Sequence, residues 1–116
     1  MERNTCLLNL SVGEAARTIC QLVEKAGKSS KMADCHELRQ GDALCGMVMI
    51  FEKYYAGAGS RMSMTVTLDN LDGPTRAHWV VTGGSGIFGT NGESKVAAEK
   101  YSNALREALF PYLNLD

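Results

Sequence analysis

Features of membrane and secreted proteins are missing from this sequence. No stretch of its 116 residues approaches the roughly 20 apolar residues that a membrane-spanning helix requires. Its beginning, MERNTCLLNLSVGEAA, lacks the long apolar run and the small-residue cleavage site of a signal peptide. We therefore expect a cytoplasmic protein without a membrane partner.

An excess of charge of one sign is absent as well. The chain has 12 Lys and Arg against 13 Asp and Glu, and its basic residues are scattered. Because nucleic-acid binding requires a basic patch, we expect no nucleic-acid partner. A chain of this length builds one core, too small for separate cofactor and substrate domains, so we predict a single domain over residues 1–116.

Closely spaced metal ligands are also lacking. The four cysteines are Cys6, Cys20, Cys35 and Cys45, and the nearest two are ten positions apart, so no C-x-x-C pair exists. Cys35 is followed by His36, but neighbours on a strand point to opposite faces. The spacing predicts buried, free thiols in a reducing compartment, with no metal site and no cofactor.

Hydrophobic periodicity, by contrast, is strong along most of the chain. Ser11 and Glu14 form a capping-box pattern that predicts the start of a helix, Gly27 is placed to end it, and Pro111 ends a second helix over 93–110. Strands are expected at 5–10, 32–39, 44–55, 61–71 and 74–83, with a loop at 28–31. This β-α-β-β-β-β-α order predicts an α+β two-layer fold, an antiparallel sheet with two helices on one face.

The last two strands predict their own pairing. Asp72-Gly73 between them favours a two-residue type I′ turn, which pairs Val66 with Trp79 and Thr67 with His78. In that register the apolar side chains share one face and the polar ones the other. One sheet face is therefore core, and the other is solvated or binds something.

Part of the sequence resembles a known family. Between Val48 and Tyr112, the stretches FEKYYAGAGSRMSMTVTLDN, GGSG and ALFPYL resemble a small bacterial protein family of unknown function. The order of elements resembles the TATA-binding-protein-like folds, whose larger relatives include helix-grip ligand binders. The resemblance implies a fold, and no activity or catalytic residue.

A glycine motif follows the last strand. Gly84, Gly86 and Gly89 spell the dinucleotide-binding pattern G-x-G-x-x-G. That pattern needs a helix that returns to a parallel strand, yet only FPYLNLD follows the last helix here. We interpret the loop as a strand-to-helix connection, and anion binding by its backbone amides is the alternative.

No catalytic set is recognisable, since neither His36 nor His78 has a motif-spaced nucleophile and acid partner. Two functions remain: a non-catalytic interaction module, or a small-molecule or anion binder, less readily an enzyme, that uses the loop 83–92. For the second function the candidate ligand-binding residues are Arg76, His78, Thr82, Gly84, Ser85 and Gly86.

Strand 44–55 favours the interaction module, because it is apolar on both sides. Alternation places Leu44, Val48 and Ile50 on one side, and Cys45, Met47, Met49 and Phe51 on the other. Only one of these sets can face the helices. The remaining set predicts a homodimer that covers the exposed stripe.

The glycine motif yields a prediction about nucleotides. We expect no specific binding of NAD or ATP, because the motif lacks its β-α-β context. Isothermal titration calorimetry measures this directly. Micromolar affinity that is lost in Gly86→Val would contradict it.

Overall fold

The computed structural model describes residues 4–25, 30–55, 60–83 and 92–115. Its elements are β1 (Thr5–Leu8), α1 (Val12–Lys25), β2 (Ser30–Gln40), β3 (Ala43–Tyr55), β4 (Ser60–Asp69), β5 (Thr75–Gly83), α2 (Gly92–Leu109) and a short 3-10 helix, η3 (Phe110–Tyr112). All neighbouring strands are antiparallel, in the order β1-β5-β4-β3-β2. The predicted fold class and element order are confirmed.

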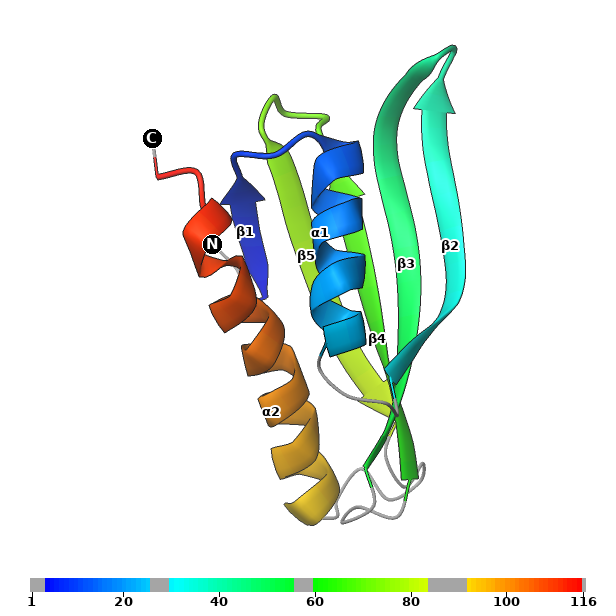
Figure 1. Ribbon diagram of the computed structural model, residues 1–116, viewed down its shortest axis with the longest axis vertical. Helices are drawn as coiled ribbons and strands as arrows, with labels where there is room; N and C mark the ends of the chain where they lie inside the picture. Colours follow the sequence, from blue (N-terminus) through cyan, green and yellow to red (C-terminus); the bar gives the residue numbers. More distant parts are fainter. Residues whose placement is uncertain (1–3, 26–29, 56–59, 84–91, 116) are drawn as a thin grey trace.

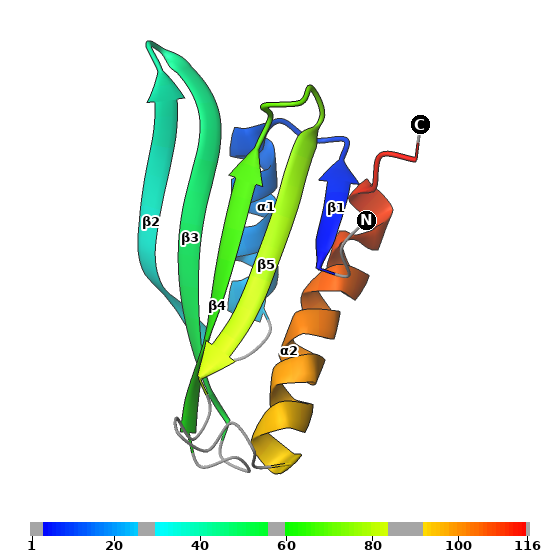
Figure 2. The ribbon, with the colours of Figure 1, turned by 180° about the vertical axis from the view of Figure 1, so that it is seen from behind.

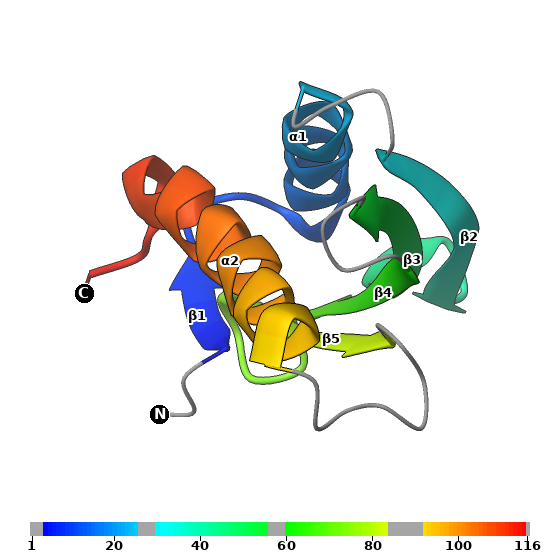
Figure 3. The same ribbon diagram turned by 90° about the horizontal axis from the view of Figure 1, so that it is seen from below.

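The two helices lie on the same side of the sheet, as the views from the front and from below show (Figure 1, Figure 3). Seen from behind, the strands face the viewer and no helix covers them (Figure 2). Neither α1 nor α2, over the residues described, is long and apolar enough to cross a membrane.

The capping box at the start of α1 is confirmed. The Ser11 N–H donates to Glu14 Oε1 at 2.9 Å, and the Glu14 N–H donates to Ser11 Oγ at 3.2 Å. These hydrogen bonds favour the charged carboxylate and lower the pKa of Glu14. The cap fixes the first turn of α1, and the buried side chains of Ala15, Ile19 and Val23 then follow at helical spacing.

The core lies between the helices and the inner face of β3, β4 and β5. The predicted pairs Val66–Trp79 and Thr67–His78 are both present in the β4–β5 ladder. Every second side chain of β4 is fully buried, and so is Trp79. The four methionines of β3 and β4 are buried as well and fill part of the core: Met47, Met49, Met62 and Met64.

The turn between β4 and β5 differs from the predicted two-residue turn. A type I′ turn needs positive φ at both central residues, but of Asp72 and Gly73 only the glycine has it. Instead, Asp69 Oδ1 accepts a hydrogen bond from the Leu71 N–H, which bends the chain early. Pro74 has no N–H to donate across the ladder. The turn is therefore longer, but it has the same centre and the register is unchanged.

Strand β2 is longer than predicted. Ser30 and Lys31, expected in a loop, pair with Lys53 and Glu52 of β3, and the Lys31 ammonium lies 4.0 Å from the Glu52 carboxylate. This cross-strand ion pair lies at the start of β2, in the part that the sequence pattern assigned to a loop. Because β2 is an edge strand, its side chains are mostly exposed.

The faces predicted for β3 are wrong at Leu44, because a β-bulge shifts the alternation there. Leu38 pairs with Gly46 and Arg39 pairs with Leu44, so Cys45 is an extra residue in the ladder. Leu44 packs against the core beside α1 and does not share the face of Val48 and Ile50. A strict two-residue alternation could not foresee this shift.

Two glycines predict stability changes of opposite sign. A Cβ on Gly46 would lie 2.8 Å from the Leu68 carbonyl oxygen, so Gly46→Ala must move backbone and should lose about 1–3 kcal/mol. A Cβ on Gly13 would meet only Leu44 Cδ2, at 3.7 Å, so Gly13→Ala in α1 should gain about 0.4–1 kcal/mol. Urea unfolding measures both. Equal midpoints for the two variants would contradict the packing at Gly46.

Candidate functional site

The face of the sheet opposite the helices, which we call the outer face, is covered by neither α1 nor α2 (Figure 2). Two rows of cross-strand neighbours cross its middle: Asp34, Ile50, Thr65 and Val80 in one, and His36, Val48, Thr67 and His78 in the other. Apolar and polar side chains alternate along the first row, whereas Val48 is the one apolar side chain of the second row. Val80 is 43% exposed, while Val48 and Ile50 are half-buried.

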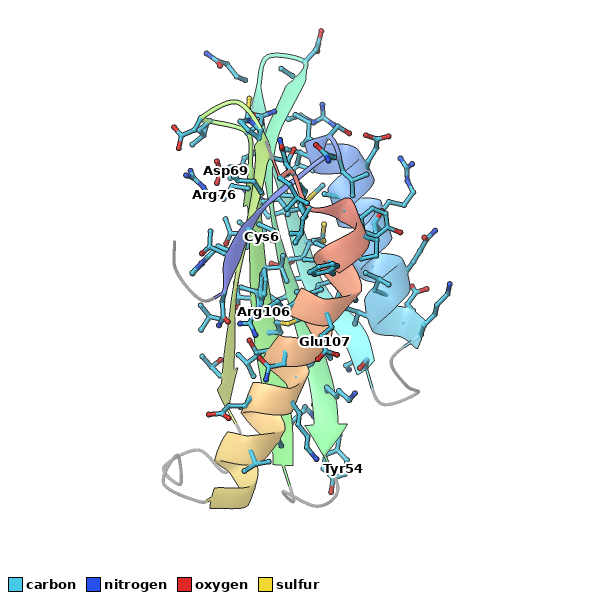
Figure 4. All side chains as sticks on the ribbon, turned by 90° about the vertical axis from the view of Figure 1, so that its left-hand side faces the viewer. Cys6, Tyr54, Asp69, Arg76, Arg106 and Glu107 are labelled. Atoms are coloured by element: carbon cyan, nitrogen blue, oxygen red, sulfur yellow. The ribbon has the colours of Figure 1, made fainter. Side chains whose placement is uncertain are left out.

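Arg76 is held on the outer face by two carboxylates. It lies 3.0 Å from Asp69 and 2.7 Å from Asp72, and these hydrogen bonds raise its pKa (Figure 4). The contact with Asp69 is a salt bridge between cross-strand neighbours of β4 and β5. Since both partners already neutralise the guanidinium, Arg76 is poorly suited to bind a further anion.

His78 also has a protein partner, because its Nδ1 lies 2.7 Å from Thr5 Oγ1 of β1. Arg76, His78 and Thr82 all point to the outer face at alternate positions of β5. Six residues of strand separate Arg76 from Thr82 by about 20 Å, so one small ligand cannot bind both. The other candidates, Gly84, Ser85 and Gly86, lie outside the described residues.

A shallow groove of about 280 Å³ lies where α2 meets β5 beyond the end of β1. Its lining consists of Asn4, Val80, Val81, Ala98, Glu99, Ser102 and Asn103. A hydrogen-bond network forms part of this lining. The Trp79 indole N–H donates to Ser102 Oγ at 3.0 Å, and the Ser102 hydroxyl donates to Asn4 Oδ1 at 3.1 Å.

Arg106 completes this network from the next turn of α2. Its guanidinium donates to Asn4 Oδ1 and Asn103 Oδ1 and lies 5.8 Å from the centroid of the Trp79 ring (Figure 4). The guanidinium of Arg106, the Trp79 ring and the two asparagine side chains therefore hold one another in position. The network fastens β1, β5 and α2 together and borders the groove on its inner side.

Sequence reasoning missed Ser102. Ser102 of α2 is buried, whereas the apolar Ala104 two positions on is exposed. A polar residue next to Tyr101 and Leu105 on a buried face was the available signal, since a buried hydroxyl needs a partner. Its partner, the single tryptophan, lies on another element and only the fold brings the two together.

The cysteines are free, as predicted, but none is fully buried: Cys6, Cys20 and Cys45 are half-buried, and Cys35 lies exposed on edge strand β2. Burial raises the pKa of Cys6 to about 11, despite the nearby Arg106 charge, so this thiol is not a nucleophile at neutral pH. No three His, Cys, Asp or Glu side chains come together to hold a metal ion within the described ranges.

The fold and its surfaces define a small two-layer α+β protein with one uncovered sheet face. More specifically, the chain belongs to a family of unknown function, DUF6054, whose model matches residues 1–108. This match confirms the resemblance to such a family. Comparison with curated proteins and with solved structures found no match, so the likeness to TATA-binding-protein-like folds and the bacterial origin stay predictions.

The network beside the groove generates a test of stability. Ser102→Ala leaves the buried Trp79 N–H without its acceptor, which should cost about 1–3 kcal/mol. Glu99→Ala, one turn away and exposed, should stay within about 0.5 kcal/mol of the parent. Urea unfolding followed by the fluorescence of Trp79 compares them. An unchanged midpoint for Ser102→Ala would refute the role of this hydrogen bond.

Proposed function

We propose that this protein is a non-catalytic interaction module of the cytoplasm that forms a homodimer through its outer face. The observation that carries the proposal is a group of apolar side chains, interspersed with threonines, at the centre of that face. Three of these side chains are at least partly exposed to solvent, namely Val48 and Ile50 on β3 and Val80 on β5, because both helices lie on the other side of the sheet. Covering an apolar patch of this kind is a common reason for association.

The rim of the face suits a symmetric pair. Lys31 with Glu52, and Arg76 with Asp69, place both signs of charge around the apolar centre. An apolar centre with a polar rim is the usual composition of a protein–protein interface. Because the charges are paired within each chain, two copies can meet without strong like-charge repulsion.

The edge of the sheet is a less suitable interface than its face. Strand β2 carries Lys31, Asp34, Glu37 and Arg39, and its ladder with β3 is irregular at Ala33. Charges and bulges on an edge strand oppose pairing with another strand. We therefore assign association to the outer face.

The groove between β5 and α2 favours a second candidate function, the binding of a small molecule or an anion. Val80 and Val81 in its lining stand four and three residues before Gly84 of the glycine loop. A groove of about 280 Å³ accommodates only a small ligand, since typical ligand pockets begin near 300 Å³.

Light scattering at micromolar concentration tests the dimer. We expect about twice the chain mass of 12.6 kDa, and Ile50→Glu or Thr65→Glu on the outer face should return the protein to one chain mass. Arg17→Glu, exposed on α1 in the opposite layer, is the matched control and should leave the dimer intact.

A parent protein of one chain mass would overturn the proposal. If, in addition, its melting temperature rises with nucleotides, phosphorylated metabolites or lipids, small-molecule binding becomes the better interpretation. A ligand at 100 times its dissociation constant stabilises by about 2.7 kcal/mol, which a thermal-shift assay detects readily.

A further inference from the structure

Five sulfur atoms gather where α1 crosses the sheet near its β2 edge. Cys20 of α1 is at the centre: its Sγ lies 3.8 Å from Met49 Sδ of β3 and 4.0 Å from Met32 Sδ of β2. Beside them, Cys35 Sγ of β2 lies 3.4 Å from Met47 Sδ of β3. Cys35 is directly opposite Met49 in the β2–β3 ladder, so the two groups are neighbours.

The two distances from Cys20 Sγ to the methionine sulfurs lie in the range found between ligands of one metal ion. A metal held about 2.3 Å from each sulfur separates its ligands by about 3.8 Å in a tetrahedron and about 4.0 Å in a plane. Contact distance alone does not distinguish a ligand set from ordinary packing. Here, however, one thiol contacts two thioethers that come from two other elements, so three soft donor atoms meet at one place.

The site is also open to solvent at one end. Met49 is fully buried, Cys20 is half-buried, and Met32 is 47% exposed on the edge strand. An ion could therefore meet Met32 first and reach Cys20 and Met49 without unfolding of the core. Burial raises the pKa of the Cys20 thiol, as do the nearby Cys35 and Glu24, so bound metal must displace a proton.

The chemistry of these ligands selects a soft, singly charged ion. Thioether and thiolate sulfur prefer Cu(I) among the biological metals. One thiolate neutralises one positive charge, whereas Zn²⁺ would keep a net charge in a half-buried site, which is costly. We propose that Cys20, Met32 and Met49 form a binding site for Cu(I), in which the Cys20 thiol loses its proton to solvent as the copper–sulfur bond forms.

This inference departs from the expectation of no metal site. That expectation rested on Cys and His spacing, and the described residues contain no cluster of three His, Cys, Asp or Glu. Neither Cys and His spacing nor clusters of these four residue types take methionine ligands into account. The proposed site is independent of dimer formation, because its residues belong to the helix side of the sheet.

Anaerobic titration with Cu(I), in competition with a chromogenic Cu(I) chelator, tests the site. We expect one copper ion per chain, no stoichiometric zinc when Zn²⁺ is offered instead, and only sulfur at about 2.3 Å by X-ray absorption. Cys20→Ser and Met49→Leu should each weaken copper binding about tenfold or more. The second variant preserves volume, so it should remain folded.

The neighbouring pair supplies matched controls. Cys35→Ser and Met47→Leu make the same chemical changes in a thiol–thioether contact that lacks a third sulfur, and both should retain copper. Met64→Leu, buried elsewhere in the sheet, should retain it too. The proposal fails if the parent protein takes up no copper, or if Cys35→Ser and Met47→Leu lose as much affinity as Cys20→Ser and Met49→Leu.

Discussion

The two-residue alternation of β4 is the constraint on which the other features depend. Met62, Met64, Val66 and Leu68 are all fully buried against the helices, while the residues between them face outward. Because β4 lies in the middle of the sheet, its register orients β3 on one side and β5 on the other. Both helices cover the face that β4 buries, so the outer face has no helix on it.

The two ends of the helix layer are held in different ways. At the α2 end, the buried Trp79 indole is fastened by a hydroxyl, an amide and a guanidinium that link three elements. At the α1 end, by contrast, Cys20 contacts the sulfur atoms of Met32 and Met49 on the sheet. Methionine adapts to the irregular space left by the β2–β3 bulges, and in doing so it places soft ligands next to a cysteine.

Much of this fold could be predicted from local patterns. Ser11 and Glu14 determine where α1 begins, because their hydrogen bonds are made within one turn of chain. The β4–β5 register follows from alternation, and it persists although the Asp69 side chain and Pro74 change the turn itself. The candidate site was less accessible to sequence reasoning, since Arg76, His78 and Thr82 share a face but are spread along a strand.

What the sequence alone determined, then, are the interactions that close within a few residues: the cap, the alternation and the order of elements. It could not decide which side of β3 meets the helices, because both of its sides are apolar. The tertiary structure decides this by packing Met47, Met49 and Phe51 beneath α1 and by shifting Leu44 through the bulge at Cys45. The contacts of Trp79 with Ser102 and of Cys20 with Met49 likewise join residues 23 and 29 positions apart. Such contacts arise only when separate elements pack, so no local pattern encodes them.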